Sequence, residues 1–312
     1  MNALKIFSSP AFFSRCATVC ATIINRRYVR GSKNYSTGIA DLDGFLREGI
    51  FPGSLVIIAG RPSMGKSALG LQLAEHQAQR GRSVLIHSLV MSRDEITVRA
   101  VTRNTGIALH RLNKKLLSSD DLPLVADALD SFNELPILID DRSDQSLDQL
   151  CENIRKTQAM LANTGRPPLG MVLVDTIKPI HPGEASHFMS EGDDVAQRLK
   201  ALAVELDVVV VAIAHVNNSV ELRYNNRPML AAIEFNGDVQ KYGDLVMMIY
   251  RGELYGHSES HGVAEIIISR NRYGALGTVP LSFDNEKMRF DNLSRDDDGQ
   301  RASCTILPFN VG

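Results

Sequence analysis

One short segment near the start of the chain constrains its fold more than any other feature. Residues 60–67 read Gly-Arg-Pro-Ser-Met-Gly-Lys-Ser and match the phosphate-binding pattern G-x-x-x-x-G-K-[ST] at every fixed position. An apolar run at 55–59 precedes the segment as a predicted buried strand, and residues 68–75 follow it with helical spacing. Strand, glycine-rich turn and helix bring backbone N–H groups to a helix start, where the helix dipole favours phosphate. The sequence therefore predicts a nucleotide site.

Each residue of this loop has an expected part in binding the nucleotide. Lys66 is expected to reach the β- and γ-phosphates, and the Ser67 hydroxyl to hold Mg²⁺. A chance Gly/Lys turn is the alternative, but the flanking strand and helix disfavour it. The expected phosphate cradle consists of Gly60, Arg61, Pro62, Ser63, Met64, Gly65, Lys66 and Ser67.

A second anchor of the site is an acid at the end of a later apolar run. Residues 171–174 are apolar and lead directly into Asp175. A carboxylate at the C-terminal edge of a strand can orient Mg²⁺ through water. Many buried strands end in Asp, so Asp175 alone would be a weak indication of a metal site. Together with the phosphate-binding loop it is a strong one. A further apolar run, 208–214, ends at His215.

The order of elements predicts the fold class. Strands expected at 83–89 and 135–139 alternate with helices up to residue 215, which predicts a mostly parallel central sheet flanked by helices. Closely spaced runs after residue 240 predict antiparallel edge strands. Together they indicate an α/β, RecA-like P-loop NTPase. The later runs are 245–250, 263–269 and 278–283.

Local signals place some helix starts and loops. Ser92 followed by Glu95 is a capping box that starts a helix, and two helical stretches with a polar break at 116–121 follow. Residues 146–161 and 195–206 are predicted helices. The polar, Asn-rich stretch 217–240 predicts a long loop or lid.

The ends of the chain differ from its centre. Residues 1–40 contain six Lys or Arg and no Asp or Glu, a composition typical of an organelle transit peptide. A disordered basic arm and a short helix docked on a neighbouring subunit are the alternatives. We expect a basic arm at 1–35, an ATPase domain at 36–293 and a polar tail at 294–312. The compartment would be mitochondrial or another organelle matrix with a transit peptide, and otherwise the cytoplasm or nucleoid.

Composition excludes some classes of protein. A net charge of −2 gives no global attraction to nucleic acid, so any such binding needs local patches. No apolar run reaches the length of a membrane span. The four cysteines are scattered without the spacing of a zinc site, which favours a reducing compartment.

Several segments resemble DnaB-type replicative helicases over residues 36–293, the motor domain of that family. The N-terminal helical domain of those helicases has no counterpart here. The resemblance implies a ring, expected to be hexameric, with ATP and Mg²⁺ between subunits and single-stranded DNA in the channel. Replication proteins such as primase would be partners. The segments are 61–67, 88–91, 199–206, 264–268, 277–279 and 289–292.

The resemblance also assigns an arginine finger that meets the γ-phosphate of a neighbouring subunit. Arg272 matches the finger, and Arg270 stands where the family usually has Lys. A solvated edge formed by two cations on a strand-end loop is the alternative. The planar guanidinium suits a phosphate group and favours the finger.

Three positions depart from the family pattern. Val90 replaces the Glu that polarises the attacking water, and an isopropyl group cannot accept a proton. Its expected substitutes are Asp94, Glu95 and Asp140. His215 replaces a γ-phosphate-sensing Gln but can still donate a hydrogen bond.

The third departure lies in the expected DNA-contacting loop, where Glu234 replaces an Arg and should repel a phosphate backbone. Arg223 and Arg227, with Asn236 and Gly237, are the expected DNA-binding residues. A simple lid turn around Arg227 is the alternative.

Three functions fit the sequence. The first is an ATP-driven DNA helicase of the DnaB type, with Lys66, Asp175, His215, Arg270 and Arg272 in catalytic roles. The second is a paralogue that binds nucleotide without hydrolysing it and serves as a replication accessory. The third is a recombination ATPase that resembles RadA, or a clock-type relative that resembles KaiC.

Overall fold

A computed structural model describes residues 34–47, 49–177, 191–223, 225–234, 241–256 and 261–293. The chain divides into two compact units, Met1–Tyr35 and Ser36–Gly312, and the second contains the sheet and its helices. The transit-peptide segment up to residue 33 and the polar tail at 294–312 lie outside the described residues. No helix within the described ranges is long and apolar enough to cross a bilayer.

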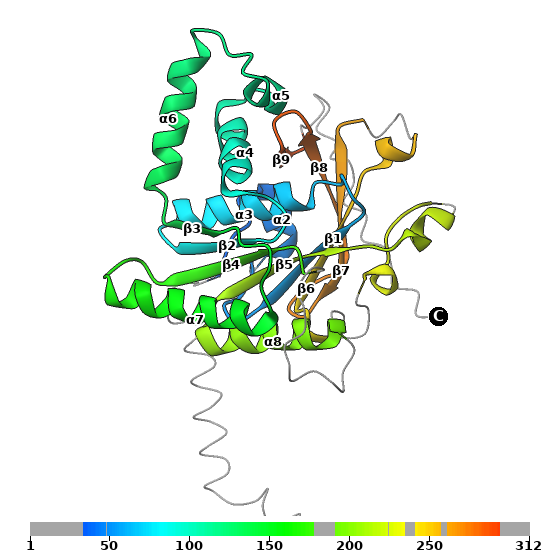
Figure 1. Cartoon of the computed structure of the whole chain (residues 1–312). Helices are drawn as coiled ribbons and strands as arrows, with labels where there is room; N and C mark the ends of the chain where they lie inside the picture. Colours follow the sequence, from blue (N-terminus) through cyan, green and yellow to red (C-terminus); the bar gives the residue numbers. More distant parts are fainter. Residues whose placement is uncertain are drawn as a thin grey trace, which may run out of the picture. The chain divides into compact units, whose positions relative to one another are not determined.

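The second unit is built on one nine-stranded sheet in the order β3-β2-β4-β5-β1-β6-β7-β8-β9 (Figure 1). The pairs from β3 to β6 are parallel, and those from β6 to β9 are antiparallel. This confirms the predicted parallel sheet with antiparallel edge strands. The strands are β1 Leu55–Gly60, β2 Ser83–Ser88, β3 Ile137–Asp140, β4 Leu169–Asp175, β5 Val209–His215, β6 Leu245–Tyr250, β7 Val263–Asn271, β8 Gly277–Asp284 and β9 Arg289–Asn292.

Helices cover both faces of the sheet. Figure 1 shows α7 and α8 side by side along one face, with α3 on the other. The apolar sides of α7 and α8 pack with β1, β4 and β5 into one buried cluster, so burial of apolar surface holds this layer together. The helices are α2 Ala40–Leu46, α3 Lys66–Gln79, α4 Arg93–Thr105, α5 Leu109–Asn113, α6 Asp121–Glu134, α7 Leu147–Asn163 and α8 Glu191–Leu206.

Capping boxes fix where two of the helices begin. At the start of α4, the Ser92 hydroxyl accepts from Glu95 N at 3.2 Å, and Glu95 Oε2 accepts from Ser92 N at 2.8 Å. This confirms the predicted box. Ser146 and Gln149 form the same arrangement before α7. Each cap contributes on the order of 1 kcal/mol to helix stability.

The described part of the region 217–240, residues 217–223 and 225–234, contains more regular structure than the predicted lid. Two short 3-10 helices, Asn218–Leu222 and Leu230–Ala232, lie within it, and Val216 forms an antiparallel bridge with Ile233. This bridge places Ile233, near the end of the described part of the loop, beside the end of β5.

The ninth strand was not predicted. Its sequence, Arg-Phe-Asp-Asn, has no apolar run, and Phe290 is its one buried residue. The strand is held from α3, because the Gln72 side chain accepts from Phe290 N at 2.9 Å and donates to Phe290 O at 2.7 Å. A contact between residues 218 positions apart leaves no local pattern in the sequence.

His87 is a fully buried titratable group in β2. Its Nδ1 lies 3.3 Å from Asp140 Oδ2, and Arg142 also faces that carboxylate. Burial lowers the pKa of His87 to about 4; the charge of Asp140 opposes this shift and that of Arg142 adds to it. The buried imidazole is therefore neutral in the folded chain until strongly acidic pH.

This burial predicts acid sensitivity of the fold. Between about pH 6.5 and 4 the unfolded chain binds a proton at His87 that the folded chain does not, so stability falls as pH falls. The pKa difference of about 2.5 corresponds to about 3 kcal/mol. Asp140 adds to the loss below its ordinary pKa of 3.8, since its folded pKa is lowered to about 2. His87→Leu should flatten the dependence of the free energy of unfolding on pH, as measured by urea titration at pH 4.5 and 7. His110→Leu, at an exposed histidine, should leave the dependence of the free energy of unfolding on pH unchanged. The same pH dependence in the two variants would contradict the prediction.

Candidate nucleotide site

The phosphate-binding loop joins the C-terminal end of β1 to the start of α3. Gly65 has φ 100° and precedes the first residue of α3. A Cβ at Gly65 would lie 2.9 Å from Phe290 and 3.2 Å from Phe283, whose rings pack against each other at 4.4 Å. Both the backbone conformation and the aromatic pair therefore require glycine here.

A buried arginine supports the other side of the loop. Arg251 Nη1 donates to Ser63 O at 3.0 Å, and its guanidinium lies 4.6 Å from the centre of the Phe283 ring. Ser63 has a positive φ of 65°, an uncommon conformation for a residue with a side chain. The hydrogen bond from Arg251 helps to hold this turn in place.

Lys66 projects back over the loop, where its Nζ donates to Arg61 O at 2.8 Å. Burial lowers the pKa of Lys66 to about 8, and the negative charges of Asp175 and Glu234 oppose that shift. The Arg61 side chain turns away to Glu221 at 2.6 Å and to Val216 O at 3.0 Å. Within the loop, Lys66 thus supplies the cation that faces the site, while Arg61 contributes its carbonyl.

Asp175 faces the loop as the sequence predicts. It is 4% exposed, and the Ser67 side chain is close enough to its carboxylate to lower its pKa. Its Oδ2 is buried and has no hydrogen-bond partner among the described residues. Burial raises the pKa of Asp175, while the Ser67 side chain and the charges of Lys66 and Arg99 lower it. A cation beside Oδ2 would relieve the cost of this buried charge.

The donor set fits a magnesium ion that is only partly held by protein. A serine hydroxyl and a carboxylate are hard oxygen ligands of the kind Mg²⁺ prefers, and the unpartnered Oδ2 is available to it. The described residues contain no group of three or more His, Cys, Asp or Glu that could hold a metal. Water and phosphate oxygens would therefore complete the coordination.

A pocket of about 300 Å³ opens beside Lys66 and Ser67. It includes Arg99 of α4, Phe283 of β8 and two residues from the turn between β8 and β9, none of which was predicted to belong to the site. They come from elements far from the loop in sequence, so no motif spacing links them to it. The unpredicted lining residues are Arg99, Phe283, Asn285 and Met288.

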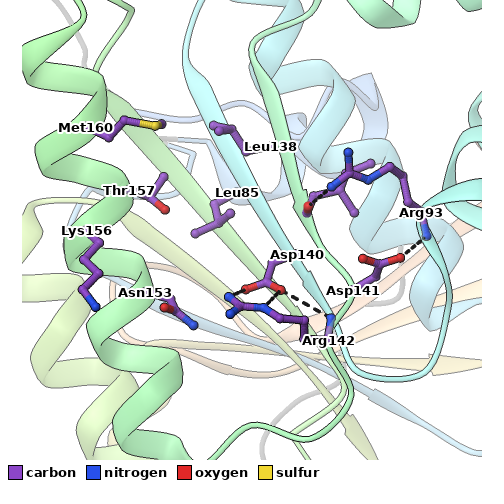
Figure 2. A pocket seen from close by; sticks show the side chains of 11 residues that line it. Leu85, Arg93, Leu138, Asp140, Asp141, Arg142, Asn153, Lys156, Thr157 and Met160 are labelled. Carbon is purple, nitrogen blue, oxygen red and sulfur yellow. Dashed lines mark hydrogen bonds and ion pairs between the residues drawn. The ribbon is translucent and has the colours of Figure 1, made fainter.

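A larger pocket of about 530 Å³ lies between β3 and α7 and contains none of the predicted phosphate ligands (Figure 2). It does contain Asp140, a proposed substitute for the missing Glu. Figure 2 shows Asp140 beside Arg142, which donates to it at 2.6 Å, and Gln145 donates to it at 3.1 Å. Glu95 is likewise engaged in the capping box, and Asp94 is exposed on the first turn of α4. Neither Asp140 nor Glu95 is placed to replace the Glu.

Val90 lies where the family resemblance places it, just beyond the end of β2. Ser88 pairs with Asp175 in the sheet, and Leu89 N donates to Asp175 O at 2.8 Å. The Val90 side chain is 67% exposed next to this edge. The position beside Asp175 thus carries an apolar, solvent-facing group.

His215 ends β5 directly beside the phosphate-binding loop, since it pairs with Gly60 of β1. Glu234 lies next to it, because Glu234 N donates to His215 O at 2.8 Å. The bridge between Val216 and Ile233 folds the loop after β5 back on the end of that strand, and the charge of Glu234 raises the pKa of Lys66. That Glu234 would repel a DNA backbone stays a prediction.

The two predicted finger residues lie at the opposite end of the strands from the loop. β7 runs antiparallel to β6, so that Asn271 pairs with Leu245 at the start of β6. The six residues of β1 separate this end of the strands from the loop, a span of about 20 Å. The Arg272 side chain is 62% exposed, with Nη1 3.4 Å from Asp244 Oδ1, and Arg270 donates to Lys241 O at 3.4 Å. Neither residue is positioned to serve the loop of its own chain.

Two of the four expected DNA-binding residues can be described. Arg227 pairs with Glu265 at 2.6 Å and lies 5.6 Å from the Tyr250 ring centre, while Arg223 Nη1 donates to Arg227 O at 3.0 Å. Both are exposed. Asn236 and Gly237 lie outside the described residues, so the DNA-binding role of this stretch stays a prediction.

Comparison with known proteins identifies relatives of this domain. The family described as DnaB-like helicase C terminal domain matches residues 35–292. The replicative DNA helicase DnaB of Pasteurella multocida is 34% identical over 273 residues, which cover 86% of this chain and 57% of that protein. The same helicase of Buchnera aphidicola is 32% identical over 269 residues, covering 85% and 57%. The chain thus spans a little over half the length of these relatives.

Solved structures agree with this assignment. An ATPase domain of known structure superimposes with a TM-score of 0.80 at 28% identity, covering 92% of this chain and all of its own. A DnaB-like replicative helicase, described with its interactions with primase, gives 0.78 at 28% identity over 89% of this chain and 66% of its own. The RadB recombinase, with a TM-score of 0.51 at 18% identity over 83% of this chain and all of its own, shares the fold.

Proposed function

Because the chain belongs to the DnaB-like helicase C-terminal domain family, we propose that it is an ATP-driven helicase acting on single-stranded DNA in replication. The observation that carries the proposal is the position of Asp175, which ends β4 with its carboxylate close enough to Ser67 and Lys66 for both to lower its pKa. This position joins the two motifs that recognise a nucleoside triphosphate, although they lie 108 positions apart in the sequence (175 − 67).

The residues of the site divide the work of binding and catalysis. Loop amides would hold the phosphates, and Lys66 would offset the negative charge that develops on the γ-phosphate. His215, at the end of β5, would donate a hydrogen bond to the same phosphate group. Ser67 and Asp175 would hold Mg²⁺, which neutralises phosphate charge when it is bound.

The proposal includes assembly into a ring, for which we take the hexamer implied by the family. Arg272 is exposed and lies about 20 Å from the loop of its own chain, the length of β1. It would therefore act on ATP bound to a neighbour, assisted by Arg270. The expected partners are single-stranded DNA, contacted through Arg223, Arg227, Asn236 and Gly237, and a primase, by analogy with the related helicase.

An ATPase assay with a helicase assay tests this function. The purified chain should hydrolyse ATP, turn it over faster when single-stranded DNA is added, and separate a forked duplex in the presence of ATP. Unwinding that is unaffected by omitting ATP, or ATP turnover unaffected by Lys66→Ala, would contradict it.

The other two functions have less support. A RadA-like or KaiC-like role rests on motifs shared by many RecA-like proteins, and RadB shares only the fold. A paralogue that binds nucleotide without hydrolysing it is suggested by Val90, and the ATPase assay separates it from a helicase. As for the compartment, the relatives named above are bacterial, which favours the cytoplasm or nucleoid over an organelle.

A further inference from the structure

The site described above has no acceptor for the proton of the attacking water where the family carries one. Val90 presents an isopropyl group, Asp140 and Glu95 are engaged elsewhere, and Asp94 is exposed to solvent in the first turn of α4. Hydrolysis needs a group that orients the water and takes up its proton. Any such group must lie beside the γ-phosphate, which in this fold means near Lys66 and the ends of β4 and β5.

Glu234 meets this requirement through its backbone position. The bridge between Val216 and Ile233 brings the chain back to the end of β5, where Glu234 N donates to His215 O at 2.8 Å. On the loop side, Val216 N donates to Gly60 O at 3.3 Å. These hydrogen bonds hold Glu234 beside the end of β5, on the side away from Gly60, so it is positioned by sheet structure one strand from the phosphate-binding loop.

The Glu234 side chain belongs to the same region of the fold. Its Oε2 is shielded from solvent, and its charge raises the pKa of Lys66, as does that of Asp175. Because Glu234 N donates to His215 O, and His215 pairs with Gly60, Glu234 lies at the end of the sheet where Lys66 would contact the terminal phosphate. Its negative charge would be unfavourable next to phosphate unless it served the water on the far side of the phosphorus.

We propose that Glu234 is the catalytic base of ATP hydrolysis in this chain. It would take the role of the glutamate that the family carries at the position of Val90. In the reaction, the water oxygen forms a bond to the γ-phosphorus, and the bond from that phosphorus to the β–γ bridging oxygen breaks. The products are ADP and inorganic phosphate. The proton released by the water passes to the Glu234 carboxylate and then to solvent. This inference rests on the proposed function.

The test compares variants of the full chain for ATP turnover and for binding of a fluorescent ATP analogue. Glu234→Gln should lower kcat by about 10²-fold, because the amide can still position water but cannot accept its proton. The dissociation constant should change by less than about threefold, since the amide keeps the shape and volume of the side chain. Glu152→Gln, an exposed Glu of α7 paired with Lys156, is the matched control and should behave as wild type.

A double variant tests whether Glu234 takes the role of the glutamate missing at position 90. Adding Val90→Glu to Glu234→Gln should restore most of the lost turnover, because a carboxylate then stands at the alternative position beside Asp175. Glu234→Gln turnover equal to that of an active wild-type chain overturns the inference and leaves the proposed function standing. A wild-type chain that does not hydrolyse ATP, with or without binding of the analogue, overturns the proposed function together with the inference.

Discussion

Replacing Arg272 by alanine is expected to lower the maximal rate of ATP hydrolysis by about 10³- to 10⁵-fold, the range found for arginine fingers. The guanidinium would stabilise charge that appears on the phosphoryl group during transfer, so ATP affinity should change much less than kcat. Arg272 is 62% exposed, with its nearest acidic contact 3.4 Å away, so its removal should leave the fold intact. Steady-state ATPase rates and equilibrium binding of ATP measure the two effects separately.

The position of Arg272 makes a second, stricter test possible. If the residue acts on a neighbour, mixing the Arg272→Ala and Lys66→Ala chains should restore activity that neither has alone. Some subunit boundaries would then combine an intact loop with an intact finger. A residue that served its own chain could not be rescued, because no chain in the mixture carries both groups. Arg289→Ala, on β9 and paired with Asp291 at 2.7 Å, is a suitable arginine control.

Lys66→Ala should lower ATP turnover by about 10³-fold and weaken ATP binding by roughly 10- to 100-fold. The lysine is the charged donor of the loop that faces the phosphates, and it acts in a buried site where such contacts are strong. Its aliphatic part is largely buried, so the variant should also be checked for folding by circular dichroism. ATP turnover and binding of the fluorescent analogue are the measurements.

Lys200→Ala is the appropriate comparison for this substitution. Lys200 pairs with the buried Asp244 at 2.6 Å, so its loss perturbs a buried lysine contact away from the loop. It should affect stability more than nucleotide binding. If both variants weaken ATP binding equally, the loss in Lys66→Ala reflects general destabilisation and the assignment of Lys66 is wrong.

Local sequence patterns predicted the part of the molecule that is built from local structure. The loop, its flanking strand and helix, and Asp175 follow from short motifs with strict physical requirements, and the structure brings Ser67 and Asp175 together. The order of strands and helices was sufficient to predict the parallel sheet with an antiparallel edge. The capping box at Ser92 was equally local and is confirmed.

What the sequence did not reveal depends on contacts between distant segments. The Phe283–Phe290 pair encloses Gly65, yet these rings lie more than 200 residues from the loop. Arg99 faces Asp175 from α4 without any motif that marks it. The position of Glu234 beside the end of β5 was not predicted either, because it depends on the bridge between Val216 and Ile233. Such packing is decided by the fold as a whole.

The placement of loop and finger at opposite ends of one sheet has a consequence for how the rate should scale with subunit number. If Arg272 serves a neighbouring subunit as proposed, each protomer carries two unlike halves of a reaction centre, and an isolated copy contains no complete centre. An open row of n copies contains n − 1 complete centres, and only closure supplies the last one. Specific ATPase activity should therefore rise with protein concentration and become constant once rings have closed. Dilution alone should lower this activity.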